Sequence, residues 1–350
     1  MIRFSLLMGF LLLSAKLFAA SEDEGQEYVK HDSLTHIREA KNLREWFTNG
    51  ETHGLLRLNT IQTRHFENSI HHAALAAGGR LMFHTASWKG FQLGIGGVFS
   101  SNIVSTDLTE SYAESYLKPK WERQLFDITD PASKSQLNEL EELFVKYSYK
   151  TAFIKIGKMP INTPLVNPQD SRMKPSAFSG IKFNWYHEKD WALDASYLIK
   201  TAPRSTKEWY SIAESINLYK RALANDSIGQ HIPESEIHSS GLLILAAHYL
   251  PFENLQFRLW QYYTTNISYV SFFQSEFDHK TFRFGLQYLY QKQAGTGGNA
   301  DKDKKYIPDG HQVHLLSAKI GYNKNNWEIS YNTTFNLNNS RFIFPREWGN

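Results

Sequence analysis

The chain has 350 residues, a net charge of +3, no cysteine and 14% aromatic residues. The near-neutral charge excludes the strongly basic surface of a nucleic-acid-binding protein, and the lack of cysteine excludes a disulfide-stabilised fold. No run of about 18 apolar residues follows the first twenty positions, so the sequence predicts no membrane-spanning α-helix after them.

The first twenty residues have the pattern of a secretory signal peptide. Arg3 precedes the apolar stretch 4–13, and small residues follow at Ala19 and Ala20. The alternative is a membrane anchor, but an apolar run of about ten residues is much shorter than the ~20 that a spanning helix needs. We therefore expect a signal peptide over residues 1–20 that directs export, with cleavage after either Ala19 or Ala20.

Residues 21–50 differ from the rest of the chain. An acidic stretch (21–26) is followed by a helix-like spacing of apolar residues from Leu34 to Phe47, which ends at the turn signal Asn49-Gly50. We interpret residues 21–50 as a periplasmic lead-in, and residues 51–350 as one domain.

From residue 51 onward, apolar and polar residues alternate with the period of a β-strand. In 281–290, Phe282, Phe284, Leu286, Tyr288 and Tyr290 alternate with mostly polar residues. About thirteen segments share this pattern: 54–64, 74–85, 89–100, 140–149, 151–158, 180–186, 191–200, 241–250, 254–264, 266–275, 281–290, 312–322 and 326–336. Most of them have roughly the 9–11 residues of a tilted transmembrane strand, whereas strands of sandwiches and propellers average about 5–6.

The segments that join these strands are either very short or long. Tight connections are predicted at 188–190, 251–253 and 323–325, and polar insertions at 101–138, 159–177, 201–239 and 291–310. Membrane β-barrels have short periplasmic turns, long outer loops and aromatic girdles at both interfaces. The sequence thus predicts an all-β, antiparallel transmembrane barrel.

Two separated motifs resemble the OprD family of outer-membrane porins. The first comprises Asn162-Thr163-Pro164, Asp170-Ser171-Arg172, Pro175, Phe178 and Gly180, and the second is the segment 342–349, Phe-Ile-Phe-Pro-Arg-Glu-Trp-Gly. The segment 54–59 is a weaker match to the first strand of the family. The resemblance implies a barrel of eighteen strands, a loop that carries Asp-Ser-Arg into the pore, and a location in the bacterial outer membrane.

The sequence departs from the family at its last residues. Asn350 directly follows the second motif, whereas the family continues into further strands. Because lipid does not tolerate an open sheet edge, we expect that the barrel domain is incomplete at the C-terminus and that the natural gene continues past Asn350.

Charged residues within the strands are candidates for the lumen of the pore. A cation on the lipid side near the midplane would cost roughly 2–4 kcal/mol, so basic residues with apolar neighbours should face water or lie near a rim. A basic ladder that guides carboxylate solutes is implied by the resemblance, although any single member could equally be a solvated charge. The candidates are Arg57, Arg80, Lys146, Lys155, Lys182, Arg258, Arg283 and Lys319.

The predicted pore loop supplies a second set of candidates. Asp170, Ser171, Arg172 and Lys174 would form the constriction and contact the solute, with Arg172 able to bind a carboxylate through two hydrogen bonds. A structural role is an equal alternative, in which Asp170 caps a turn and Arg172 ties the loop to the wall.

Catalysis and metal binding find little support in the sequence. No Gly-x-Ser-x-Gly motif occurs; the adjacent His71 and His72 would point to opposite faces of a strand, and His311 and His314 are a weak metal signal. We expect no catalytic residue, metal or cofactor. The expected function is passive diffusion of small hydrophilic solutes with a preference for carboxylates or amino-acid-like molecules, by a monomer or trimer that the barrel assembly machinery inserts into outer-membrane lipid. The alternatives are a barrel enzyme, a structural barrel without an open pore, or a secreted soluble β protein.

Overall fold

The computed structural model describes residues 38–64, 71–109, 119, 121–130, 137–187, 190–216, 218, 236–338 and 340–349. The predicted signal peptide, residues 21–37 of the predicted lead-in and part of the predicted turn 188–190 lie outside these ranges. Residues from Ala40 onward form one compact unit, which is described below.

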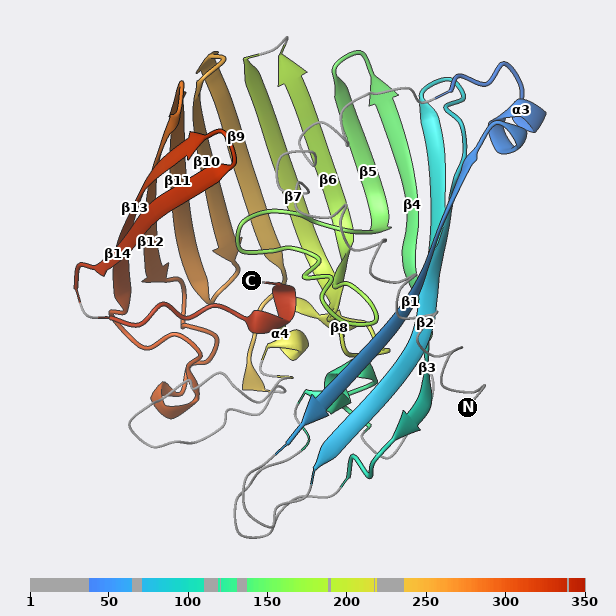
Figure 1. Cartoon of the computed structure of the whole chain (residues 1–350), viewed down its shortest axis with the longest axis horizontal. Coiled ribbons are helices and arrows are strands. Elements are labelled where there is room, and N and C mark those ends of the chain that lie inside the picture. The colour runs from blue at the N-terminus through green and yellow to red at the C-terminus, as the bar shows by residue number, and fades with distance from the viewer. Residues whose placement is uncertain are drawn as a thin grey trace. The chain divides into compact units, whose positions relative to one another are not determined.

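The described residues form a single antiparallel sheet in which each strand pairs with its neighbours in the chain (Figure 1). Its strands are β1 (Glu51–Thr63), β2 (His72–His84), β3 (Phe91–Ser105), β4 (Glu139–Tyr149), β5 (Ala152–Met159), β6 (Ala177–His187), β7 (Trp191–Ala202), β9 (Leu242–Phe252), β10 (Leu255–Thr264), β11 (Ser268–His279), β12 (Phe282–Gln293), β13 (Gln312–Lys324) and β14 (Trp327–Asn336). The short strand β8 (Tyr210–Ser211) pairs only with β7. Within the described residues, no pairing joins the edge strands β1 and β14.

The helices are few and short. They are α3 (Leu43–Thr48), α4 (Ile212–Ser215) and the 3-10 helices η2 (Glu122–Leu125), η4 (Lys302–Lys304) and η5 (Arg346–Trp348). Helix α3 begins after Asn42, whose side chain accepts a hydrogen bond from Glu45 N at 2.9 Å, the usual way to satisfy a free amide at a helix start. In the described part of the predicted lead-in, residues 38–50, α3 is the only helix. The turn at Asn49 and Gly50 leads from this helix directly into β1.

Each of the thirteen segments predicted from alternation coincides with a strand of the sheet, and the predicted all-β antiparallel fold is confirmed. The ends differ by a few residues; β11, for example, continues to His279, whereas the alternation predicts an end at 275. Strand β8 and helix α4 were not predicted, because elements of two and four residues are too short to show a period.

Alternation gives the sheet an apolar face and a polar face. On β4, Leu143, Val145 and Tyr147 are exposed on the apolar face, whereas Phe144 and Lys146 between them are buried on the polar face. On β12, Phe282, Phe284 and Leu286 are likewise exposed. An extended surface of exposed apolar side chains cannot be stable against water, so the apolar face requires a covering.

The long connections lie at the same end of the sheet, although residues 265–267 also make a short connection between β10 and β11 at that end. Short turns of the described chain join β2 to β3, β4 to β5, β9 to β10, β11 to β12 and β13 to β14 at one end, and we call this end the short-turn end. Long segments follow β3, β5, β7 and β12 at the other end. The residues Lys89, Lys150, Lys280 and Asn325 adopt positive φ angles of 50–56° in the short turns, which reverse the chain within very few residues.

The sheet curves around the loop between β5 and β6. Leu165 N of this loop donates to Tyr262 Oη on β10 at 3.4 Å, while Asp170 of the same loop pairs with Arg57 on β1. Because β1 and β10 are far apart in the strand order, one loop can reach both only if the sheet bends. A buried cluster that includes Val166, Phe178, Tyr262 and Trp348 fills the space between the loops and the polar face.

Candidate functional site

The loop of residues 160–176, which contains the predicted Asp-Ser-Arg core, lies against the polar face of the sheet. Thr163 N donates to Val166 O at 2.7 Å and Ser176 N donates to Pro168 O at 2.7 Å, so hydrogen bonds within the loop fix its path. Gln169 has a φ of 45°, a left-handed conformation that turns the chain directly before Asp170.

The two motifs that resemble the same family meet in space. Asn167 N of the loop donates to Trp348 O at 2.9 Å, and Gly349 lies so close that an added Cβ would be 2.4 Å from Asn167 O. The indole nitrogen of Trp348 donates to Ser215 Oγ at 2.8 Å, and the Trp348 side chain is fully buried. The second motif therefore packs against the loop and holds it at Asn167.

Asp170 ties the loop to the first strand. Arg57 donates from Nη1 to Asp170 Oδ1 at 2.5 Å and from Nη2 to Oδ2 at 3.0 Å, which is the two-pronged geometry of a guanidinium–carboxylate pair. Arg57 Nη1 also donates to Arg172 O at 2.5 Å. One arginine of the wall thus holds two residues of the loop.

Arg172 and a second arginine, Arg204, both donate hydrogen bonds to Ser171. Arg172 Nε donates to Gln124 Oε1 at 3.3 Å, and Arg204 Nη1 donates to Ser171 Oγ at 2.6 Å. Burial and the like charge of Arg204 lower the pKa of the Arg172 guanidinium. Two cations that repel each other in a partly desolvated place favour an anion between them.

Lys174 occupies a different environment from Arg172. Its side chain is fully buried, and its ammonium forms an ion pair with Glu139 at the start of β4. Burial lowers the pKa of Lys174, and the charge of Glu139 opposes this effect. Lys174 presents no ammonium surface to solvent, so its described contacts fit the structural alternative of loop anchoring.

The acidic residues of β4 pair with basic residues of β2. Arg80 Nε lies 3.0 Å from Glu141 Oε2, and Arg80 Nη2 lies 3.6 Å from Glu142 Oε1. His84 Nε2 lies 3.0 Å from Glu142 Oε2. Charges of both signs therefore line the wall next to the loop, and the site is mixed in sign.

Three of the predicted basic residues form a row across neighbouring strands. Lys146 on β4 is opposite Lys155 on β5, and Lys155 is opposite Lys182 on β6. The Lys146 ammonium lies 4.2 Å from the ring centre of Phe153, and the Lys155 ammonium lies 4.5 Å from that of Phe144. Cation–π contacts stabilise the charges and hold the aliphatic stems against the wall.

The remaining three basic candidates have local contacts on later strands. Arg258 donates to Gln256 at 2.6 Å on β10, and Arg283 Nε donates to Asp278 Oδ1 at 2.9 Å near the short-turn end. Lys319 on β13 is opposite Gly285 and Asn332. Each of the eight strand candidates has at least one exposed apolar neighbour in its strand, which places the eight candidates on the polar face.

Sequence reasoning missed several members of this cluster. Arg204 and Gln124 lie in long insertions where no periodicity shows which way a side chain points. Glu142 had a usable signal, because it alternates with Leu143 and Val145 and should lie on the polar face for the same reason as the cations. Glu141 gave no such signal, since it reaches the same side only where the pairing between β3 and β4 shifts its register.

Among the described residues, no group of three or more His, Asp or Glu side chains is arranged to hold a metal ion. Within the same residues, no helix is both long and apolar enough to cross a membrane.

Comparison with known proteins gives one family and a set of similar folds. A family model described as outer membrane porin, OprD family, matches residues 124–344. No curated protein matches the sequence. At the identities found for solved structures, the likeness is one of fold.

Three similar structures illustrate this fold. They are OccAB3 of Acinetobacter baumannii (14% identity, TM-score 0.61, covering 83% of this chain and 68% of that one), OccK8 (OprE) of Pseudomonas aeruginosa (13%, 0.61, 86% and 71%) and OccD3 (OpdP) of Pseudomonas aeruginosa (12%, 0.57, 81% and 57%). The chain therefore spans between 57% and 71% of the length of these proteins.

Proposed function

We propose, because the chain belongs to the OprD family of outer-membrane porins, that it is a channel for passive diffusion of small hydrophilic solutes and that it prefers carboxylates. Members of this family lie in the bacterial outer membrane and are channels, not enzymes. Lipid then covers the apolar face of the sheet, and the polar face borders the water-filled path.

The pair of Arg172 and Arg204 around Ser171 is the observation that supports carboxylate selectivity. A carboxylate has two oxygens in one plane, and each can accept a charge-assisted hydrogen bond from a guanidinium. Arg204 Nε is buried and has no hydrogen-bond partner among the described residues, so what Arg204 contributes is a positive charge beside Arg172. A hydrogen bond to a charged group contributes about 1.5–3 kcal/mol.

The row of Lys146, Lys155 and Lys182 supports the same proposal from the strands next to the loop. Three cations in register across β4, β5 and β6 make a strip of positive potential along the polar face. Such a strip raises the local concentration of anions and provides several weak sites, as conduction requires. Asp170 takes no part in solute binding in this proposal, because both of its oxygens bind Arg57.

Single-channel conductance of the full chain in a planar bilayer under a salt gradient tests the proposal. We expect discrete current steps, and we expect benzoate to compete with the chloride current. Arg172→Ala and Arg204→Ala should each weaken this competition roughly 10- to 100-fold, as the loss of one charge-assisted hydrogen bond implies. Arg44→Ala, an exposed arginine on α3, is the matched control and should leave the competition unchanged.

Three outcomes are informative. An unchanged reversal potential and unchanged benzoate competition in both variants would remove the arginine pair from solute selection. Equal losses in Arg44→Ala would show that net charge matters and position does not. A folded, inserted protein without current steps would contradict the open channel itself and favour a barrel without a pore.

A further inference from the structure

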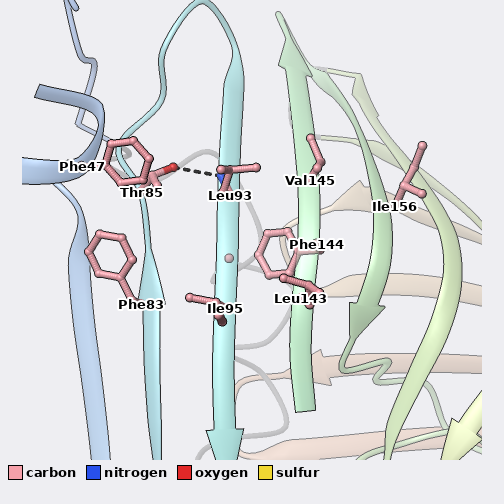
Figure 2. Close-up of a pocket in the computed structure, with 10 residues that line it drawn as sticks. Phe47, Phe83, Thr85, Leu93, Ile95, Leu143, Phe144, Val145 and Ile156 are labelled. Atoms are coloured by element: carbon pink, nitrogen blue, oxygen red, sulfur yellow. Dashed lines mark hydrogen bonds between the residues drawn. The ribbon is translucent and has the colours of Figure 1, made fainter. Parts of the chain in front are cut away.

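A hollow of about 300 Å³ crosses the apolar face of β2, β3, β4 and β5 near the short-turn end (Figure 2). Two rows of side chains border it. The register places Phe83 opposite Ile95 and Ile95 opposite Leu143 in the first row. In the second row, Leu93 is opposite Val145 and Val145 is opposite Ile156. The hollow therefore runs across the strands as a short groove.

The groove has almost no polar surface to hydrate. Thr85 is the one polar side chain in its lining, and its hydroxyl is already used, since it accepts from Leu93 N at 2.9 Å and donates to Ala86 O at 3.0 Å. Ile95, Leu143, Val145 and Ile156 are about half exposed. The groove is thus apolar and open along its length toward the side of the sheet that faces lipid.

Helix α3 closes one end of the groove. Phe47 lies beside Thr85 and above Phe83 in Figure 2, so its ring forms the end wall. The helix is held in place by Ala86 N, which donates to Trp46 O at 2.9 Å, and by the Trp46 indole, which donates to Phe91 O at 3.1 Å. A defined end distinguishes this groove from the ordinary roughness of a membrane-facing wall.

Aromatic and cationic residues lie between the groove and the short-turn end. Phe91 and Tyr147 stack with ring centres 4.8 Å apart, one row nearer the turns than Leu93 and Val145. Beyond them, the Lys89 ammonium lies 5.3 Å from the Trp88 ring and the Lys150 ammonium lies 5.3 Å from the Tyr149 ring. Ser148 N donates to Gly90 O at 2.8 Å and ties the two turns together.

This order of chemistry matches one phospholipid molecule. The four residue-to-residue steps along β3 from Phe91 to Ile95 correspond to about 13 Å, which is within one leaflet of a hydrocarbon core ~30 Å thick. Aromatic rings mark the interface, and lysines beyond it complement a phosphate. Short turns lie on the periplasmic side in barrels of this kind.

We propose that this groove is a binding site for a single phospholipid of the periplasmic leaflet, with one acyl chain between the two rows and with the phosphate near Lys89 and Lys150. The site is separate from the channel, and it uses the opposite face of the sheet. It requires only that the apolar face lies in the membrane.

Native mass spectrometry of the full chain in mild detergent with added phosphatidylglycerol tests this site. We expect one retained phospholipid per chain. Val145→Trp fills the groove with a larger side chain. Binding should weaken about tenfold when roughly two methylene groups of the acyl chain lose their place in the groove. Leu286→Trp is the matched control, because Leu286 on β12 is exposed to a similar degree (43% against 45%) on the same face; it should retain the lipid.

The head-group contact has its own pair of variants. Lys89→Gln combined with Lys150→Gln should reduce retention, whereas Lys324→Gln, an exposed lysine at the short-turn end of β13, should not. A phospholipid with a photoreactive group in its acyl chain should label peptides of β3, β4 and β5 more than those of β12 and β13.

Several results would overturn the proposal. Equal retention in Val145→Trp and Leu286→Trp, or labelling spread evenly over all strands, would mean that only bulk lipid covers the face. A retained second chain in place of lipid would identify the groove as a self-association surface. Conductance is measured separately on the same variants, so loss of lipid with unchanged current steps leaves the channel proposal intact.

Discussion

Arg57 contributes three hydrogen bonds to the loop of residues 160–176, although it belongs to the edge strand β1 and is 113 positions away from Asp170 in sequence. A planar guanidinium is suited to this role because its donors point in fixed directions. The pair is only partly buried, with side-chain exposures of 21% and 31%, so screening by water reduces its contribution to stability. Its main effect is to fix the position of the loop.

We expect Arg57→Met and Asp170→Asn to release the loop without preventing barrel formation. Each substitution should increase current noise in single-channel recordings, because a loop that is no longer tied to β1 samples more positions. The double variant should resemble Arg57→Met, because that substitution already removes the contact with Asp170 together with the hydrogen bond to Arg172 O. Additive effects of the two substitutions would show that they act through different partners.

Lys174 and Glu139 form a buried pair next to this contact. Removing one partner of a buried pair leaves an uncompensated charge and costs about 3–5 kcal/mol. We therefore expect Lys174→Met to lower the free energy of unfolding by that amount in urea titrations of the folded protein. The double variant Lys174→Met with Glu139→Gln should recover most of the loss, and a double variant as unstable as the single one would contradict the pairing.

At the scale of elements, β5 and β6 approach their neighbours closely at two glycines. An added Cβ at Gly180 would lie 2.1 Å from Tyr197 O, where the register between β6 and β7 shifts. Gly157 has a φ of 129°, and its added Cβ would lie 2.2 Å from Leu143 O. The neighbouring backbone cannot shift to make room for an added Cβ at either glycine without disturbing a strand pairing.

Gly180→Ala should therefore destabilise the sheet by about 1–3 kcal/mol, as overpacking in a tight place does. The fraction of protein that keeps its folded mobility in an unheated SDS gel measures this loss. Gly54→Ala on β1 is the matched control, since its added Cβ would meet nothing closer than 3.8 Å. Equal behaviour of the two variants would mean that the close approach at Gly180 has no energetic consequence.

Elements were predictable from the sequence where a period of two ran over seven or more residues. The alternation of Phe282, Phe284 and Leu286 identifies β12 and its apolar face without any long-range information. The same reasoning predicts that Arg57, Arg80 and Lys146 face the lumen. This reasoning depends only on the free-energy cost of placing a cation against lipid.

The arrangement of the loop contacts was not predictable in the same way. Asp170 has no neighbour in sequence that identifies Arg57 as its partner, and Arg204 lies in an insertion without a period. The role of Lys174 depends on Glu139, which reaches it only through the fold of the loop. Periodicity tells which face a residue lies on, and tertiary packing decides what it contacts there.

For the whole molecule, the contact between the two family motifs joins the loop of residues 160–176 to segment 342–349. The Trp348 side chain is fully buried and contacts Phe344 at a ring-centre distance of 5.5 Å. Gln291 on β12 also binds the backbone of Ile343 through both ends of its amide, at 2.6 and 3.0 Å. The second motif thus connects the loop to a distant part of the wall.

We expect Trp348→Ala to lower the free energy of unfolding by about 3–5 kcal/mol, the usual range for a fully buried tryptophan. Trp348→Phe should cost less, because it loses the hydrogen bond to Ser215 but keeps most of the packing. Urea titration followed by intrinsic fluorescence gives both values. Trp327→Ala on β14, where the side chain is 71% exposed, is the control and should change stability little.

The strand order also determines the sequence of events during folding. Because each strand pairs with its neighbour in the chain, hairpins can form from nearby segments with little loss of chain entropy. The Arg57–Asp170 and Asn167–Trp348 contacts require parts of the chain that are more than a hundred residues apart, so they can form only after the wall between them exists. We therefore expect the loop of residues 160–176 to acquire its native contacts after the wall has formed.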